Sequence, residues 1–330
     1  RRTDINDTRQ DISNEDLIPE ETRVLTISRT GYAKTQPLEE YREQRRGGQG
    51  KAAASVKEED VIQNLYVLSS HSQMLCFTTK GKVYWLKVYE VPVASRTSKG
   101  RPLVNMLNLD DDEKVSDILP VDEFSEDRYV FMATRKGTTK KTQLSFFAKK
   151  YKSGIKAIKL DADDELIGSA ITNGDDEILL ASSAGKLIRF SEKKVRPMGR
   201  TARGVRGMRI KKDQQIISLM VADNEKEILC VSENGFGKKT SVDDFPTHNR
   251  GGQGVISIKT SERNGLMVAS TLVDNNDGIM LISDKGTMIR TSAEQIPTIS
   301  RNTQGVKIIT PKEGEKILEC VRIDPEDEGE

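Results

Sequence analysis

The chain has 330 residues, of which 31% are charged, and its 52 Lys+Arg against 51 Asp+Glu leave a formal net charge of only +1. Its longest uninterrupted apolar run is Tyr129 to Ala133, whereas a membrane-spanning helix needs ~20 apolar residues, so no membrane protein is expected. The polar first residues predict no signal peptide, and three widely spaced cysteines favour a reducing cytoplasm over a disulfide framework.

The charge is unevenly distributed along the chain. Residues 1–22 carry a net charge of −4 and residues 311–330 a net charge of −5, which leaves +10 for residues 23–310. The near-neutral total therefore averages a basic body and two acidic ends. A basic body admits a polyanionic partner that the total charge would exclude.

A repeat of about fifty residues runs through the whole body. A short apolar stretch followed by a polar turn and a glycine, termed the first glycine, occurs six times. In chain order these glycines are Gly31, Gly81, Gly137, Gly185, Gly235 and Gly286. Six equivalent positions predict six copies of one structural unit.

A second glycine follows each first glycine after 19 residues, or after 17 in the third copy. A cation stands four residues before every second glycine, and in five copies a further cation stands three or four residues after the first glycine. The second glycines are Gly50, Gly100, Gly154, Gly204, Gly254 and Gly305.

The apolar runs predict strands, because they are only four to six residues long and are separated by polar turns. Positions six and four residues before the first glycine, such as Leu25 and Ile27, share one parity and are expected to face the core. Repeats of about fifty residues with four strands each match propeller blades. We therefore predict an all-β, six-bladed, propeller-like disc of four-stranded blades rather than a helical solenoid.

The recurring cations suggest a DNA interface. A cation at a fixed repeat position recurs around the rim of a propeller, and glycine beside it permits loop conformations in which backbone amides approach a phosphate. Contacts of this kind with DNA are independent of base sequence and sensitive to salt. The candidate DNA-binding residues on the rim are Lys34, Arg96, Lys99, Arg101, Lys140, Lys141, Lys150, Arg189, Arg200, Arg203, Lys238, Lys239, Arg250, Arg290 and Arg301.

The first repeat contains the densest cationic loop, and this loop carries a family resemblance. Its residues are Gln44, Arg45, Arg46, Gly47, Gly48, Gln49 and Gly50. The segment resembles the seven-residue box Gln-Arg-Arg-Gly-Gly-(Lys or Arg)-Gly of the C-terminal domain of bacterial DNA gyrase A subunits, from which it departs only at Gln49. The turns at 31–35 and 302–306 resemble the first and last blades of that family, and the resemblance covers nearly the whole chain.

The resemblance implies a β-pinwheel, in which blades exchange strands, and right-handed wrapping of double-stranded DNA that enables negative supercoiling. It implies a bacterial, cytoplasmic, nucleoid-associated protein whose partners are the gyrase B subunit together with the rest of the gyrase A subunit. The isolated domain is expected to be monomeric and to use no cofactor, since ATP and Mg²⁺ act elsewhere in the holoenzyme. The expected organisation is an acidic linker at 1–22, one pinwheel at 23–323 with blades of about 23–72, 73–126, 127–175, 176–225, 226–276 and 277–323, and an acidic tail at 324–330 that competes with DNA.

Two alternative functions stay open. One is the related domain of the topoisomerase IV A-type subunit, and the other is a propeller that serves as a protein-interaction platform. An enzyme is not expected from this chain alone. His71 and His248 lie 177 residues apart, none of the tyrosines stands in a breakage-reunion motif, and no phosphate-binding loop occurs.

Overall fold

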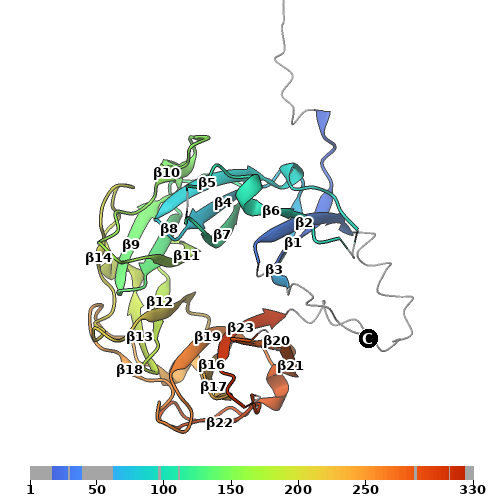
Figure 1. Cartoon of the computed structure of the whole chain (residues 1–330). Coiled ribbons are helices and arrows are strands. Elements are labelled where there is room, and N and C mark those ends of the chain that lie inside the picture. The colour runs from blue at the N-terminus through green and yellow to red at the C-terminus, as the bar shows by residue number, and fades with distance from the viewer. Residues whose placement is uncertain are drawn as a thin grey trace, which may run out of the picture.

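Six antiparallel sheets follow one another around a common centre in chain order (Figure 1). The computed structural model describes residues 17–28, 30–38, 62–95, 98–110, 112–285, 288–311 and 313–323. Within these ranges, five sheets have four strands and the sixth has three. The predicted all-β, six-bladed fold is confirmed. No helix among the described residues is long and apolar enough to cross a membrane.

Each blade orders its strands from the innermost to the outermost. Blade 1 consists of β3 (Ile62–Ser69), β1 (Thr22–Ser28), β2 (Tyr32–Pro37) and β6 (Arg101–Pro102). Blade 2 consists of β7 (Val115–Val121), β4 (Gln73–Thr78), β5 (Lys82–Lys87) and β10 (Ile155–Lys156). Blade 3 consists of β11 (Leu166–Thr172), β8 (Tyr129–Thr134), β9 (Thr138–Gln143) and β14 (Val205–Arg206). Blade 4 consists of β15 (Ile216–Val221), β12 (Glu177–Ser182), β13 (Lys186–Ser191) and β18 (Val255–Ile256). Blade 5 consists of β19 (Met267–Val273), β16 (Glu227–Ser232), β17 (Phe236–Ser241) and β22 (Val306–Lys307). Blade 6 consists of β23 (Ile317–Ile323), β20 (Gly278–Ser283) and β21 (Met288–Ser292).

Each four-stranded blade takes its outermost strand from the next sequence repeat. Blade 3, for example, is completed by β14, which pairs Val205 with Thr139 and Arg206 with Thr138. The strand exchange that the resemblance implied is therefore present, and the sheets cross the predicted boundaries between repeats.

Short 3₁₀ helices link the sequence repeats to the exchanged strands. In repeats 2 to 6 one of them follows the third strand of the blade, and in repeat 2 another follows the exchanged strand. They are η2 (Val88–Glu90), η3 (Leu103–Asn105), η4 (Leu144–Phe147), η5 (Glu192–Lys194), η6 (Val242–Asp244) and η7 (Ala293–Gln295).

Five apolar cores lie between neighbouring blades. The middle strand β4 shows how they are filled: Met74 and Cys76 pack toward blade 1, whereas Leu75 and Phe77 pack toward blade 3. Successive side chains of a strand point to opposite faces, so a blade packed between two neighbours buries both. The positions predicted to face the core are buried, except Met280, which is half-buried, and the opposite face of the middle strand is buried as well.

Candidate nucleic-acid interface

The outer edge of the ring is formed by segments that we call rim loops, each of which runs from the 3₁₀ helix after the third strand of a blade to the second glycine. They comprise residues 91–100, 148–154, 195–204, 245–254 and 296–305, with 96 and 97 outside the described residues. A rim loop begins beside the third strand of the preceding blade. In loop 195–204 the Met198 amide donates to the Lys141 carbonyl at 2.8 Å, and in loop 245–254 the His248 amide donates to the Arg189 carbonyl at 2.7 Å.

Both repeated glycines allow this close approach of backbones. Gly204 has a φ of +100°, and a Cβ there would lie 2.4 Å from the Thr139 carbonyl oxygen of blade 3. Gly185 has a φ of +72°, and a Cβ there would lie 2.1 Å from the Ile258 carbonyl oxygen. Only glycine combines this conformation with this contact. The loop conformation inferred from the repeats is confirmed at these positions, and its use is the docking of the exchanged strand.

Backbone hydrogen bonds join each rim loop from 195–204 onward to the segment that follows the preceding rim loop. The amide of Lys159 donates to Ala202 at 3.1 Å, that of Arg209 to Gly252 at 2.7 Å, and that of Lys259 to Thr303 at 2.8 Å. Each bond links a residue five positions after one second glycine to the rim loop of the next repeat. The rim of blades 2 to 5 is thus one continuous surface.

Several predicted cations lie on this surface. Lys99, Arg101, Lys150 and Arg203 are exposed, and Arg200, Arg250 and Arg301 are half-buried. Arg250 is held by hydrogen bonds to the Lys194 carbonyl at 2.8 Å and to the Arg206 carbonyl at 3.1 Å, while Arg203 pairs with Asp161. Arg290 on β21 is also exposed. The cations that stand four residues before the second glycine therefore lie at the surface of the rim.

The sequence reasoning missed a further set of exposed rim cations. They stand two or five residues after the second glycine, a phase that the repeat alignment already contained. They are Lys156, Lys159, Arg206, Arg209, Lys259 and Lys307. Three of them, Lys156, Arg206 and Lys307, end the exchanged strands β10, β14 and β22.

Three predicted rim cations are buried between blades instead, and their assignment to the DNA interface is corrected. Lys141, Arg189 and Lys239 stand four residues after the first glycine and are at most 8% exposed. Each of them pairs with a glutamate. Lys141 and Arg189 also donate to carbonyls of the following repeat, whereas Lys239 donates to Asn275 of its own repeat. The pairs are Lys141 with Glu192 at 3.2 Å, Arg189 with Glu177, and Lys239 with Glu227 at 2.8 Å.

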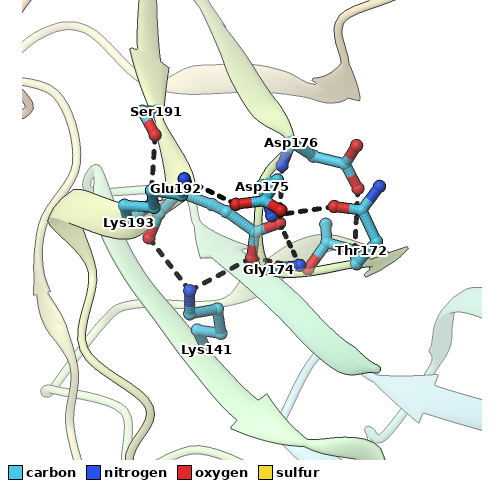
Figure 2. A network of polar contacts seen from close by, with 9 residues as sticks. Lys141, Thr172, Gly174, Asp175, Asp176, Ser191, Glu192 and Lys193 are labelled. Carbon is cyan, nitrogen blue, oxygen red and sulfur yellow. Dashed lines mark hydrogen bonds and ion pairs between the residues drawn. The ribbon is translucent and has the colours of Figure 1, made fainter. Parts of the chain in front are cut away.

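The Lys141 pair shows how complete this arrangement is (Figure 2). The fully buried Glu192 carboxylate also accepts hydrogen bonds from the Thr172 hydroxyl at 2.8 Å and from the amides of Gly174 at 2.8 Å and Asp176 at 3.0 Å. A buried charge is tolerated when its partners satisfy it in this way. Lys141 therefore fastens blade 3 to blade 4 and has no access to a phosphate.

The same repeat position fastens other blades with neutral donors. The Trp85 indole donates to the Phe147 carbonyl at 2.8 Å, and the Thr35 hydroxyl donates to the Val91 carbonyl at 3.2 Å. In both pairs the acceptor lies in or next to a 3₁₀ helix of the following repeat. What recurs at this position is thus a side chain that donates a hydrogen bond, and this side chain can be cationic or neutral.

Two more predicted cations, Lys140 and Lys238, are also buried. Their assignment as phosphate contacts is therefore corrected as well. They stand three residues after the first glycine, and the side-chain nitrogen of each donates to a carbonyl of a rim loop, that of Arg200 or Ser300. Burial lowers the pKa of Lys140 to about 7 and that of Lys238 to about 8. Lys34, at the same repeat position, is half-buried and donates to the carbonyls of Ser95 at 3.2 Å and Ser98 at 2.9 Å.

The cationic box Gln44 to Gly50, Arg96, and the acidic segments 1–16 and 324–330 lie outside the described residues. No group of His, Cys, Asp and Glu that could hold a metal ion occurs in the part of the chain that the structure covers. Burial raises the pKa of Cys76 and that of Cys320 to about 12, which keeps both thiols protonated near neutral pH.

Comparisons with known proteins agree on one family. The family model described as the DNA gyrase C-terminal domain, beta-propeller, matches residues 22–69, 72–122, 128–173, 176–223, 226–273 and 279–324. The DNA gyrase A subunit of Salmonella typhimurium strain LT2 is 49% identical over 331 residues, which cover all of this chain and 38% of that relative. The corresponding protein of Pseudomonas aeruginosa is 45% identical over 366 residues, covering 98% of this chain and 40% of the relative.

Two solved structures share the fold. A C-terminal domain of DNA topoisomerase IV superposes with a TM-score of 0.80 at 23% identity, covering 94% of this chain and 95% of that one. A DNA gyrase A C-terminal domain superposes with a TM-score of 0.70 at 24% identity, covering 92% of this chain and all of that one.

Proposed function

Because this chain belongs to the DNA gyrase C-terminal β-propeller family, we propose that it binds duplex DNA without regard to base sequence and bends it around the rim. The observation that carries the proposal is the set of exposed cations that recurs in phase on rim loops joined by backbone hydrogen bonds. DNA carries one negative charge per ~1.7 Å of axis, so a curved row of cations offers a matching track.

Bending supplies the reason why the cations must recur. Bending 20–30 base pairs by 40–90° costs about 1–6 kcal/mol, and contacts distributed over several blades can repay this cost. A rim on which Lys156, Arg206 and Lys307 end the exchanged strands of blades 2, 3 and 5 distributes contacts in this way. The box Gln44 to Gly50 is proposed to complete a right-handed wrap, as the resemblance implies.

In the cell we propose that the chain acts as part of a bacterial, cytoplasmic gyrase, together with the B subunit as well as the remainder of the A subunit. The curated relatives are more than twice as long as this chain. DNA cleavage and ATP hydrolysis are accordingly assigned to the other parts of that assembly, and this chain contributes binding and wrapping.

The experiment measures duplex binding as a function of salt. We expect a straight line of log K against log salt with a slope of about −0.9 per phosphate contact. Replacing both Lys156 and Arg206 by Gln is expected to make the slope shallower by about 2. The matched control replaces Lys226 and Arg128, which lie in loops between successive blades at β15–β16 and β7–β8, and is expected to leave the slope unchanged. Equal effects of the two double variants would contradict the assignment to the rim.

A further inference from the structure

Two buried lysines lie directly beneath the rim, at the same position of alternate repeats. Lys140 of β9 and Lys238 of β17 each stand three residues after the first glycine, and both are 0% exposed. Lys34 of β2 occupies the same position in blade 1. In the other repeats, Tyr84, Ile188 and Ile289 stand there.

The ammonium groups of these lysines bind the backbone of the rim loop that docks on the same blade. Lys140 Nζ donates to the Ala157 carbonyl at 2.5 Å and to the carbonyl of Arg200 itself. Lys238 Nζ donates to the Ser300 carbonyl at 2.6 Å, next to Arg301. Each lysine thus holds the part of the loop that presents a half-buried arginine to solvent.

The charges that face the two lysines differ from those around Lys141 and Lys239. Lys140 faces Arg200, and no carboxylate pairs with it among the residues that the structure describes. Lys238 interacts electrostatically with Arg301 of rim loop 296–305, with Asp244 of η6 and with Cys230 of β16. Burial is the main cause that lowers the pKa of both lysines, and the nearby arginine lowers it further. Around Lys238, Cys230 and Asp244 act in the opposite direction.

We propose that Lys140 and Lys238 are positioning residues for DNA, which hold rim loops 195–204 and 296–305 from beneath and become protonated when a phosphate binds Arg200 or Arg301 above them. This inference rests on the proposed function. A bound phosphate neutralises the arginine, so the repulsion that opposed the charged lysine disappears. A proton from the buffer then forms the third N–H bond of the ammonium, and no other group changes.

The sign of the pH dependence follows from this coupling. The pKa of each lysine is higher in the complex than in the free protein, so binding takes up protons near and above neutral pH. Affinity is greatest below the free pKa values of about 7 and about 8, and it falls as the pH rises through the values of the complex. A rise of about half a pKa unit corresponds to about a threefold loss of affinity for each lysine.

The experiment is a calorimetric titration of the protein with linear duplex DNA in two buffers of different ionisation enthalpy at pH 7.5. All variants carry His248→Gln, which removes the histidine of rim loop 245–254. We expect a net uptake of protons by this background protein. The uptake falls with Lys140→Met or Lys238→Met and is lost in the double variant. Lys156→Met, on the exposed end of β10, weakens binding but leaves the uptake unchanged.

The possible outcomes separate the two levels of the proposal. Failure of the wild-type protein to bind DNA at low salt would overturn the proposed function itself. DNA binding without proton uptake in the background protein, or with equal uptake in the double methionine variant, would overturn the inference and leave the function standing. If a methionine variant does not fold, the pKa of each lysine measured by NMR with and without DNA decides the question. No rise on binding contradicts the inference.

Discussion

The side chain four residues after the first glycine shows how one repeat position can mislead. Sequence periodicity places Lys141, Arg189 and Lys239 in register, and a recurring cation on a basic body favours a phosphate contact. Their acidic partners were not apparent, because Glu192 lies 51 residues beyond Lys141, and Glu177 comes near Arg189 only when β12 pairs with β13, which sets Glu177 opposite Ser191 and Arg189 opposite Leu179. A useful signal was present, since Glu177 and Glu227 both stand eight residues before a first glycine whose repeat contains a buried cation.

The buried pair at the junction of blades 3 and 4 makes a prediction about stability. Replacing Lys141 by Met removes one partner of a desolvated ion pair and leaves the Glu192 charge uncompensated, which typically costs about 3–5 kcal/mol of unfolding free energy. Urea unfolding measures this loss. Lys193→Met removes the exposed partner of Asp175 in the same region and is expected to change stability by less than about 1 kcal/mol. Equal effects of the two variants would contradict the role assigned to Lys141.

A second prediction at this scale concerns Asp117 of the inner strand β7. Its carboxylate accepts hydrogen bonds from the Ser169 amide at 2.7 Å and the Ser169 hydroxyl at 3.0 Å, yet burial raises its pKa to about 6. An acid whose pKa is raised by folding stabilises the protein fully below its unfolded pKa of about 4. This stabilisation is lost as the pH rises through about 6. Unfolding free energies of Asp117→Asn between pH 4 and 6 are expected to depend less on pH than those of the wild type, and parallel curves would refute the assignment.

At the scale of elements, the strands and their number could be predicted, whereas their partners could not. Apolar runs of period two and the glycine turns identify β1, β4, β8, β12, β16 and β20. The exchanged strands have only two residues each, too short for any periodicity to indicate them, and the resemblance alone implied their exchange. The burial of both faces of the middle strands also depends on neighbouring blades, which a pattern within one strand does not reveal.

The rim loop 195–204 offers a matched test of how the exchanged strand docks. A Cβ at Gly204 would meet the Thr139 carbonyl at 2.4 Å, whereas a Cβ at Gly199 in the same loop would meet nothing within 4 Å. Gly204→Ala is expected to destabilise the protein by about 1–3 kcal/mol and to weaken DNA binding, because a strained φ is combined with a backbone clash. Gly199→Ala is expected to do neither. Thermal unfolding and DNA titration of both variants provide the check, and a tolerated Gly204→Ala would contradict this packing.

At the scale of the whole molecule, the low net charge conceals a separation of charge. Exposed cations lie on the rim loops or exchanged strands of blades 1, 2, 3 and 5, whereas the loops that join successive blades carry Asp122, Asp175, Asp223 and Asp274. A total of +1 therefore describes neither surface. Near-neutrality limits non-specific attraction, while the local field of the rim favours a polyanion.

Wrapping of DNA around this rim is the central claim, and the linking number of closed circular DNA tests it most directly. Relaxed plasmid is incubated with the protein, treated with a topoisomerase that relaxes supercoils, and freed of protein before electrophoresis. A right-handed wrap traps positive writhe, so the recovered plasmid is expected to show a linking number above that of the relaxed control, with a smaller increase for the Lys156→Gln and Arg206→Gln double variant. An unchanged linking number at low salt, with DNA bound, would contradict wrapping.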